Sequence, residues 1–413
     1  MIRQLIRNAR LFDSQAAVFR EGCTLVIEGE RIVAATQQPI AVDDVARVID
    51  AAGRAVLPGL IDAHVHVVAS SHDLAALALA PASLVAAESG RLMSAMLRRG
   101  FTTVRDAAGA DRGLREAVAR GLFEGPRLFI AGRSISQTGG HSDLRAQGVH
   151  GEMFCACAGL GLAGVIADGV GEVRRAVREQ IRQGVDQIKI MAGGGVSSPN
   201  DPIDGTQFSM QELRAAVEEA EAANRYTLAH AYSPRAVTRA VQAGVRSIEH
   251  GNLIDEDTAR LMKTQGTYFV PTLATYAALA DEGERLGWSA AMLDKLRHVA
   301  ERGLEAVRIA RAEGVPVVFG TDLLGHMHAR QNSEFALRAP AVPTLELLQS
   351  ATWTAARLMG QERHIGALVP GAFADLLIVD GDPATSLDML AAPEDGIRVL
   401  MQGGRVVEDR PAA

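Results

Sequence analysis

The chain has 413 residues and a formal net charge of −7. This length exceeds the usual size of one domain, and the acidic balance gives no electrostatic basis for binding a nucleic acid or an anionic membrane. The cysteines are Cys23, Cys155 and Cys157, an odd and sparse set that excludes a disulfide framework and fits a reducing compartment.

Two segments could target or anchor the chain, and neither has the required pattern. Residues 1–10 carry three arginines without the apolar stretch of a signal peptide. The apolar run at residues 74–87 is too short to span a bilayer. We therefore expect a cytoplasmic protein with no membrane partner and no nucleic-acid partner.

Both ends of the chain have the pattern of β-structure. Short strand-like runs are separated by turns, and Gly403 and Gly404 have the pattern of a hairpin turn. The runs lie at residues 5–11, 24–28, 32–35, 46–49, 374–379 and 397–407. Because chain ends often lie close together, we expect residues 1–55 and 368–413 to form one discontinuous β-sandwich domain.

Between the two ends, apolar strand-like runs alternate with amphipathic helical patterns, such as those at residues 210–223 and 235–243. The candidate strands are residues 56–68, 101–106, 127–131, 187–191, 226–230, 246–250, 268–271 and 315–322. Alternating units of this kind favour a parallel sheet, and this count is that of a (β/α)8 TIM barrel. We predict an α/β fold in which residues 56–367 form such a barrel as the catalytic domain. A doubly wound open sheet is the alternative.

Several of the expected strands carry side chains that can bind a metal at their C-terminal ends, where barrel enzymes place their active sites. The first strand carries His64 and His66, which share one face because side chains alternate along a strand. The other strands carry Lys189, His230, His250 and Asp322. A His-x-His pair alone is weak evidence, and each of these residues alone could have a purely structural role. Their joint placement at one rim predicts a metal site.

This ordered set resembles the amidohydrolase superfamily of the type with a binuclear metal centre. Lys189 stands between Ile188 and Ile190, where an ordinary ammonium group would be a costly buried charge. Further local sequences resemble the prolidase-like, metal-dependent carboxypeptidase branch, to which ochratoxin-degrading amidohydrolases are related. They are residues 136–141 (SQTGGH), 188–191 (IKIM), 229–232 (AHAY), 248–252 (IEHGN) and 320–325 (GTDLLG).

The resemblance implies two divalent metal ions, which are usually zinc in this family. His64, His66 and Asp322 would bind the first metal, and His230 and His250 the second. Lys189, carboxylated by CO2, would bridge the two metals as a carbamate, because a carbamate offers two anionic oxygens where an ammonium offers none. The family also favours homo-oligomers, so we expect one here.

The resemblance also implies a reaction. Members of the branch release a C-terminal amino acid from Xaa-Pro and other dipeptides or from N-acyl amino acids, and some relatives cleave the amide of ochratoxin A, by attack of a metal-bridging hydroxide. Asp322 would carry the proton to the leaving amine, His141 would stabilise the oxyanion, and Tyr232 would bind the free carboxylate of the substrate. An ordinary loop histidine and a packing tyrosine are the alternatives for the last two.

Two other function classes stay open at this point. A deaminase or cyclic-amide hydrolase of the same superfamily would share much of the ligand set, and a metal-free scaffold would keep only the fold. We expect substrate selection to depend on the loops at residues 67–87, 142–160 and 276–287. Asp106 is expected to support the ligands, and Cys155, Cys157, His326 and His328 are left without a role.

Overall fold

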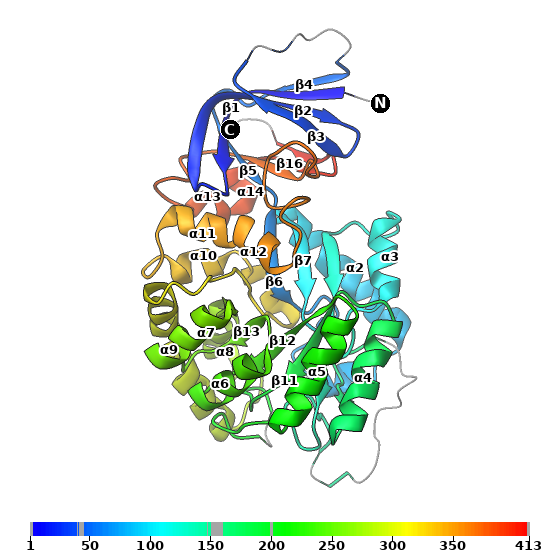
Figure 1. The fold of residues 1–413 in the computed structure, drawn as a ribbon. Helices are drawn as coiled ribbons and strands as arrows, with labels where there is room; N and C mark the ends of the chain where they lie inside the picture. Colours follow the sequence, from blue (N-terminus) through cyan, green and yellow to red (C-terminus); the bar gives the residue numbers. More distant parts are fainter. Residues whose placement is uncertain are drawn as a thin grey trace. The chain divides into compact units, whose positions relative to one another are not determined.

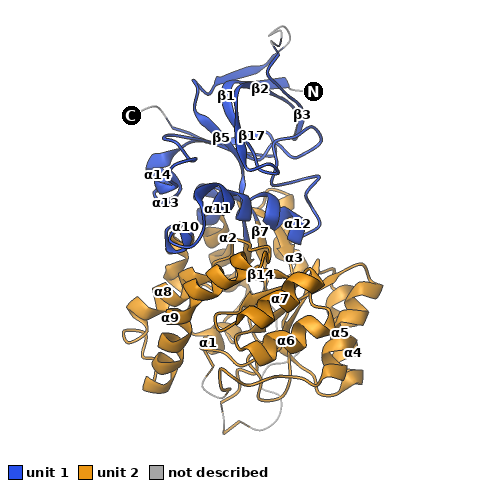
Figure 2. Cartoon of the chain, turned by 60° about the vertical axis from the view of Figure 1, so that its left-hand side comes forward, with its two compact units in different colours: residues 1–62, 95–103, 335–413 blue, residues 63–94, 104–334 orange. Residues whose placement is uncertain are grey.

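The computed structural model describes residues 3–38, 40, 45–146, 148–149, 160–198 and 201–410. The chain forms two compact units (Figure 2). Unit 1 consists of Met1–Asp62, Ala95–Thr103 and Phe335–Ala413, and unit 2 consists of Ala63–Ser94 and Val104–Glu334. The domain boundaries at residues 55 and 368 that the sequence suggests stay a prediction.

Unit 1 is built around one sheet to which both ends of the chain contribute. Its strands are β1 (Arg3–Asp13), β2 (Val18–Glu28), β3 (Arg31–Thr36), β4 (Arg47–Asp50), β5 (Ala55–Pro58), β15 (Leu376–Val379), β16 (Ile397–Gln402) and β17 (Arg405–Asp409). They run in the order β17-β16-β15-β5-β1-β2-β3, with β4 paired to β1. Figure 1 labels β1 to β5 and β16 among them. The antiparallel pairing of β5 with β15 places Val56 opposite Ile378 and so joins the two ends of the chain.

Alternate positions along these strands share one apolar core. Leu25 and Ile27 of β2 pack in the same buried cluster as Leu376 and Ile378 of β15 and Ile6 of β1. A spacing of two residues puts side chains on the same face of a strand. Since burying each such side chain contributes about 1.5–3 kcal/mol, the N-terminal and C-terminal strands depend on each other for their core.

The second group of strands carries the residues expected at the site. They are β6 (Leu60–Val65), β7 (Phe101–Asp106), β8 (Arg127–Ile130), β9 (Ile135–Ser136), β10 (Val165–Ile166), β11 (Gln187–Met191), β12 (Tyr226–Ala231), β13 (Ser247–His250) and β14 (Tyr268–Val270). β6, β7 and β8 form one sheet, and a second sheet has the order β10-β9-β11-β12-β13-β14. Pairing in the second sheet is parallel, and its register sets His230 opposite Met191 and His250 opposite Ala231.

Helices connect these strands, as the alternating pattern predicts. The helices are α1 (Leu74–Ala78), α2 (Ala82–Arg98), α3 (Arg112–Ala119), α4 (Val170–Arg182), α5 (Met210–Ala222), α6 (Pro234–Ala243), α7 (Glu256–Gln265), α8 (Leu273–Glu282), α9 (Ala290–Ala312), the 3-10 helix η1 (Gly325–Arg330), α10 (Ser333–Arg338), α11 (Thr344–Ser350), α12 (Trp353–Leu358), α13 (Asp388–Ala391) and α14 (Pro393–Gly396). α5 begins with a capping box between Ser209 and Glu212. α6 begins with a Ser233 cap and Pro234, and ends at Gly244, whose φ of 100° suits glycine.

Two of the expected strands differ from the structure. Residues 56–68 are not one strand, because Gly59 separates β5 from β6. A Cβ at Gly59 would lie 2.0 Å from the hydroxyl oxygen of Thr102, so only glycine fits at this crossing. Residues 315–322 form no regular strand: Val317 makes an isolated bridge to Phe269. Further along, the amides of residues 321 and 322 both donate to the carbonyl oxygen of His64, at 3.2 and 2.8 Å, which breaks the ladder pattern.

Among the helices in the part of the chain that the structure describes, none is both long and apolar enough to cross a membrane. The apolar run at residues 74–87 is divided between α1 and the first turns of α2. Cys155 and Cys157 lie outside the described residues.

Candidate metal centre

All the site residues that the sequence suggests lie around one cavity in unit 2. The cavity has a volume of about 490 Å³ and is lined, among others, by His64, His66, His141, Lys189, His230, Tyr232, His250 and Asp322. β6, β11, β12 and β13 supply the ligand-type residues within strands, and residues 66 and 322 follow where strand pairing ends. Segments far apart in the sequence therefore deliver nitrogen and oxygen donors to one place.

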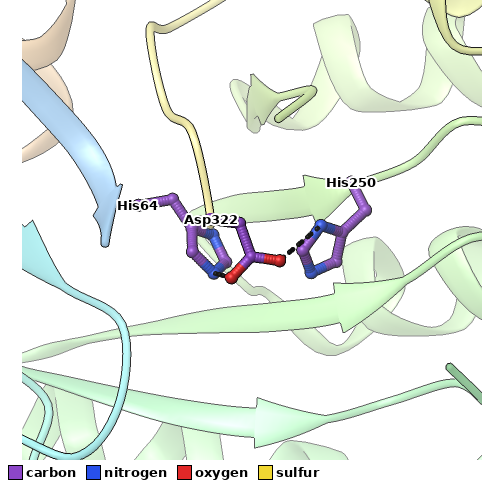
Figure 3. Close-up of side chains that lie close together, drawn as sticks. All are labelled: His64, His250 and Asp322. Carbon is purple, nitrogen blue, oxygen red and sulfur yellow. Dashed lines mark ion pairs between the residues drawn. The ribbon is translucent and has the colours of Figure 1, made fainter. Parts of the chain in front are cut away.

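Asp322 is at the centre of this group (Figure 3). Its Oδ1 lies 3.4 Å from Nε2 of His64 and 3.0 Å from Nε2 of His66, and its Oδ2 lies 3.9 Å from Nδ1 of His250. One ligand atom from each of His64, His250 and Asp322 falls within 4.8 Å of the others. Imidazole nitrogens and carboxylate oxygens are the donors that zinc and related divalent ions accept, so this donor set fits a metal.

His64 and His66 each have one ring nitrogen held by the protein. Nδ1 of His64 lies 2.6 Å from Oε2 of Glu249, and Nδ1 of His66 lies 2.8 Å from the carbonyl oxygen of Ala108. In a neutral imidazole the nitrogen that donates to such an oxygen carries the proton. Nε2 of each ring is the nitrogen that faces Asp322 and that could bind a metal. Although burial lowers the pKa of His66, its contact with Asp322 raises that pKa above the usual value.

His230 and His250 are held in the same manner from other elements. Nε2 of His230 lies 3.0 Å from the carbonyl oxygen of Gly194, which leaves Nδ1 as the nitrogen available to bind a metal. Nδ1 of His250 lies 2.9 Å from Oγ1 of Thr272. Burial, together with nearby positive groups, lowers the pKa of both histidines well below the usual value. Both rings are therefore neutral at physiological pH, the state that metal binding requires.

Lys189 is buried in the middle of β11, with an exposed fraction of 2%. Burial lowers the pKa of its amine to about 8. At pH 7 on the order of a tenth of the amine is thus uncharged, far more than for an ordinary lysine, and a neutral amine is the form that can react with CO2. Asp322 behaves in the opposite way: although burial raises its pKa, the neighbouring His64 and His66 lower it well below the usual value, so this carboxylate is ionised.

A buried ion pair that sequence reasoning missed stands behind His64. Both carboxylate oxygens of Glu249 accept hydrogen bonds from Nη2 of Arg105, at 2.8 and 2.9 Å, and Nε of Arg105 donates to the carbonyl oxygen of Ala63 at 2.5 Å. The side chains of Arg105 and Glu249 are fully buried. Burial raises the pKa of Glu249, but Arg105 and His64 lower it by a larger amount. The net shift is therefore downward, and the carboxylate stays charged. Glu249 therefore fixes the ring orientation of His64 and makes it a stronger donor.

At the site, three residues other than glycine have a positive φ, a backbone conformation that residues with a side chain rarely adopt. His250 has a φ of 77°, Asp322 a φ of 55° and Thr272 a φ of 50°. Each such residue costs on the order of 1–3 kcal/mol and persists only where the surroundings hold it, which is typical of functional sites. At Asp322 the two hydrogen bonds from residues 321 and 322 to the carbonyl of His64 hold the chain in this conformation.

His141 lies beside the ligand group on the loop after β9. Its ring stacks on that of His230, with centroids 4.2 Å apart and an interplanar angle of 15°. Gly195 lets the ring come this close, because a Cβ there would lie only 1.7 Å from Cε1 of His141. The neighbouring Gly194 is equally restricted, with the carbonyl oxygen of Pro202 at 1.9 Å from its would-be Cβ. Residues 193–195 thus pack closely beside the site.

Tyr232 is paired with a tyrosine that sequence reasoning missed. The hydroxyl of Tyr276, on α8, donates to the hydroxyl of Tyr232 at 2.9 Å, and both side chains line the cavity. The ring of Tyr232 also stacks against His250, at 5.3 Å between centroids. Burial raises the pKa of both tyrosines above the usual value, so both remain protonated and can donate. No spacing in the sequence connects the two, because they come from different strand–helix units.

The other residues singled out by the sequence have simpler surroundings. Asp106 accepts hydrogen bonds from the amides of Val67, at 2.8 Å, and Ala110, at 3.0 Å, and so shapes the turn that follows His66. Burial raises its pKa to about 6. His326 pairs with Glu282, and His328 is held by the carbonyl oxygen of Ala69 at 3.1 Å. The described cavity lining includes neither histidine.

Large apolar side chains also line the cavity. They are Leu74, Leu162, Leu279, Leu286, Trp288 and Met292. Arg145 also lines it and forms an ion pair with Asp143 at 2.5 Å. Residues from all three loops expected to select the substrate contribute to the lining. A cavity lined by both polar and apolar side chains suits a small amphiphilic molecule.

Comparison with known proteins places these features in a family context. The profile of the amidohydrolase family matches residues 55–407. Ochratoxinase from Aspergillus niger is 33% identical over 367 residues, which cover 85% of this chain and 75% of that protein. Its crystal structure superposes with a TM-score of 0.87 at 28% identity, covering 99% of this chain and 96% of that one.

Two further solved structures are similar over almost the whole chain. A prolidase in complex with N-methylphosphonate-L-proline has 45% identity and a TM-score of 0.96, covering 99% of this chain and 100% of that chain. A Xaa-Pro dipeptidase with methionine bound in its active site has 30% identity and a TM-score of 0.88, covering 98% of this chain and 100% of that chain.

Proposed function

This chain belongs to the amidohydrolase family and is a metal-dependent enzyme that hydrolyses amide bonds, and from this premise we propose that it releases a C-terminal amino acid from dipeptides or N-acyl amino acids. One observation carries the proposal: a histidine, lysine and aspartate donor set shares its cavity with a pair of buried, protonated tyrosines. The names of the relatives support it, since they include a prolidase, a Xaa-Pro dipeptidase and an ochratoxinase.

The donor set suits two divalent ions, with zinc the first choice for imidazole and carboxylate ligands. His64, His66 and Asp322 would hold one ion, and His230 and His250 the other. Lys189 would bridge them as a CO2-derived carbamate, which agrees with its burial and its lowered pKa. Two such ions would supply an activated water and polarise the scissile carbonyl.

The side chains around the proposed metal sites would carry out the rest of the reaction. Asp322, ionised and central, accepts the proton of the attacking water and delivers it to the amide nitrogen, whose bond to the carbonyl carbon then breaks. His141, stacked beside His230, donates to the oxygen on which negative charge develops. Tyr232, whose hydroxyl accepts the hydrogen bond from Tyr276, donates its own hydrogen to the free carboxylate of the substrate. The apolar side chains of the cavity receive the acyl side of the substrate.

The strands that carry these residues correspond to a (β/α)8 barrel, with residues 56–367 as the catalytic domain. Backbone hydrogen bonds support this arrangement. The amide of Asp186 donates to the carbonyl oxygen of Ile130 at 2.8 Å, linking the start of β11 to β8. The irregular segment at residues 315–322 bonds to β14 through Phe269 and to β6 through Ala63, the latter at 2.9 Å from the oxygen of Phe319. That segment would occupy the position of the eighth barrel strand.

A substrate panel with matched capped controls tests the proposal. The panel contains Xaa-Pro dipeptides, N-acyl amino acids and ochratoxin A, each with a counterpart whose C-terminal carboxylate is converted to a primary amide, and the products are followed by mass spectrometry. We expect the free acids to be hydrolysed and the capped counterparts to be hydrolysed far more slowly. Absence of cleavage across the panel, or equal cleavage of capped and free substrates, would contradict the proposed function.

A further inference from the structure

A buried carboxylate outside the set of ligand-type residues faces His141. Oδ2 of Asp201 lies 3.3 Å from Nδ1 of His141, and the side chain of Asp201 has an exposed fraction of only 4%. The same oxygen accepts the amide of Gly195 at 2.9 Å and Nε2 of Gln207 at 3.2 Å. A carboxylate with several donors on one oxygen is fixed in place as well as charged. Asp201 therefore presents a negative charge of defined position to one edge of the imidazole.

The other sides of His141 are also fixed. Oε1 of Gln207 accepts the backbone amide of His141 at 3.1 Å, so the same glutamine binds both His141 and Asp201. One face of the ring stacks on His230, and the ring comes so close to Gly195 that no side chain fits there. With Nδ1 facing Asp201, Nε2 is the ring nitrogen left for a substrate in the cavity.

A lysine from a distant helix supports the segment that carries Asp201. Nζ of Lys295, on α9, donates to the carbonyl oxygens of Asp201 at 2.5 Å, Ser198 at 2.9 Å and Gly195 at 3.4 Å. An ammonium group has three hydrogens to donate, and here they meet the carbonyls of residues 195, 198 and 201. The backbone at Asp201, whose side chain faces His141, is thereby tied to α9.

We infer that Asp201 is a positioning residue that acts on the reaction through His141. A carboxylate opposite one imidazole nitrogen fixes the orientation of the ring, so that the second nitrogen is directed at the place where charge develops. Without Asp201 the ring would still stack on His230 but would lose the charged partner that sets which edge faces the substrate. This inference rests on the role given to His141 in the proposed function.

A double-mutant cycle separates this role from a merely structural one. The variants are Asp201→Ala, His141→Ala and the double variant, with Asp255→Ala as the control. Asp255 caps the start of α7, so its replacement also removes a hydrogen-bonded carboxylate, but one outside the cavity lining. The readouts are kcat and KM for the best substrate of the panel, metal content, and thermal midpoint.

We expect Asp201→Ala to lower kcat by roughly 10- to 100-fold, the usual range for a group that orients a functional histidine. KM should change by less than about threefold, and metal content should match the wild type, because Asp201 touches none of the proposed ligands directly. The double variant should be no slower than His141→Ala alone, since Asp201 has nothing left to act through. Additive losses, or loss of metal in Asp201→Ala, would overturn the inference.

A crystal structure of Asp201→Ala gives a readout that needs no substrate. We expect the imidazole of residue 141 to rotate or to occupy more than one orientation, while the ligand-type histidines keep theirs. An unchanged ring orientation would overturn the inference. If the wild type cleaves nothing in the panel, the proposed function fails, but this structural comparison still decides whether Asp201 positions His141.

Discussion

Replacing Glu249 with Gln removes a negative charge from the interior of unit 2 while leaving side-chain size almost unchanged. The neighbour most affected is Arg105, whose guanidinium donates to both carboxylate oxygens and whose side chain is fully buried. His64 loses the carboxylate at 2.6 Å that holds its Nδ1. We therefore expect two separate losses, one in folding stability and one in metal binding.

The sizes of the two losses follow from these contacts. Removing one partner of a buried ion pair costs about 3–5 kcal/mol, because the other charge is left in a site of low polarity. Removing the group that orients a metal-binding histidine weakens metal affinity by roughly 10- to 100-fold, equivalent to about 1.4–2.8 kcal/mol. An exposed pair behaves differently: Glu116 and Arg112 are both open to solvent, so water screens their attraction and the pair should contribute little to stability.

Urea unfolding of chelator-treated protein measures the loss of folding stability. Competition between the metal-refilled protein and a chelating dye measures the loss of metal affinity. Glu116→Gln is the matched control, since it removes the same charge from a surface pair. The reasoning would be refuted if Glu249→Gln unfolded at the same urea concentration as Glu116→Gln and bound metal as tightly as the wild type.

The remaining predictions concern residues beside the ligands. Gly195→Ala should displace the ring of His141, because the new Cβ would lie 1.7 Å from Cε1. We expect kcat to fall while metal content stays unchanged. Full activity in this variant would contradict the close packing of Gly195 and His141. Tyr232→Phe should raise KM for substrates with a free carboxylate by roughly 10-fold or more, the value of a hydrogen bond to a charged group. Its KM for amide-capped substrates should not change, and an equal rise for both kinds would assign Tyr232 a packing role.

The sequence was most informative about the strands that carry site residues and about the helices that follow them. Strand-like runs ending in histidine or carrying Lys189 predict elements close to β11, β12 and β13, because a short apolar run between turn residues is typical of a buried strand. The capping residues before α5 and α6 likewise indicate where those helices begin. The resemblance to amidohydrolases then suggested which polar residues act together.

Long-range pairing is what the sequence could not reveal. Arg105 and Glu249 are separated by 144 positions, and each alone looks like a polar residue in an apolar strand. Asp201 stands in a loop without a regular pattern, and its link to His141 depends on Gln207, Gly195 and Lys295 coming together in space. Residues 315–322 read as a strand because they are apolar, but the paired amides that bond to the carbonyl of His64 break the ladder.

Elemental analysis of metal content tests whether the site holds two metal ions bridged by a carboxylated Lys189. Wild-type protein and Lys189→Met would be stripped with chelator and refilled with zinc, with and without bicarbonate. We expect close to two metal ions per wild-type chain when bicarbonate is present, and one or fewer in Lys189→Met under either condition. Two ions per chain in Lys189→Met, or less than one in the wild type with bicarbonate, would contradict this proposal.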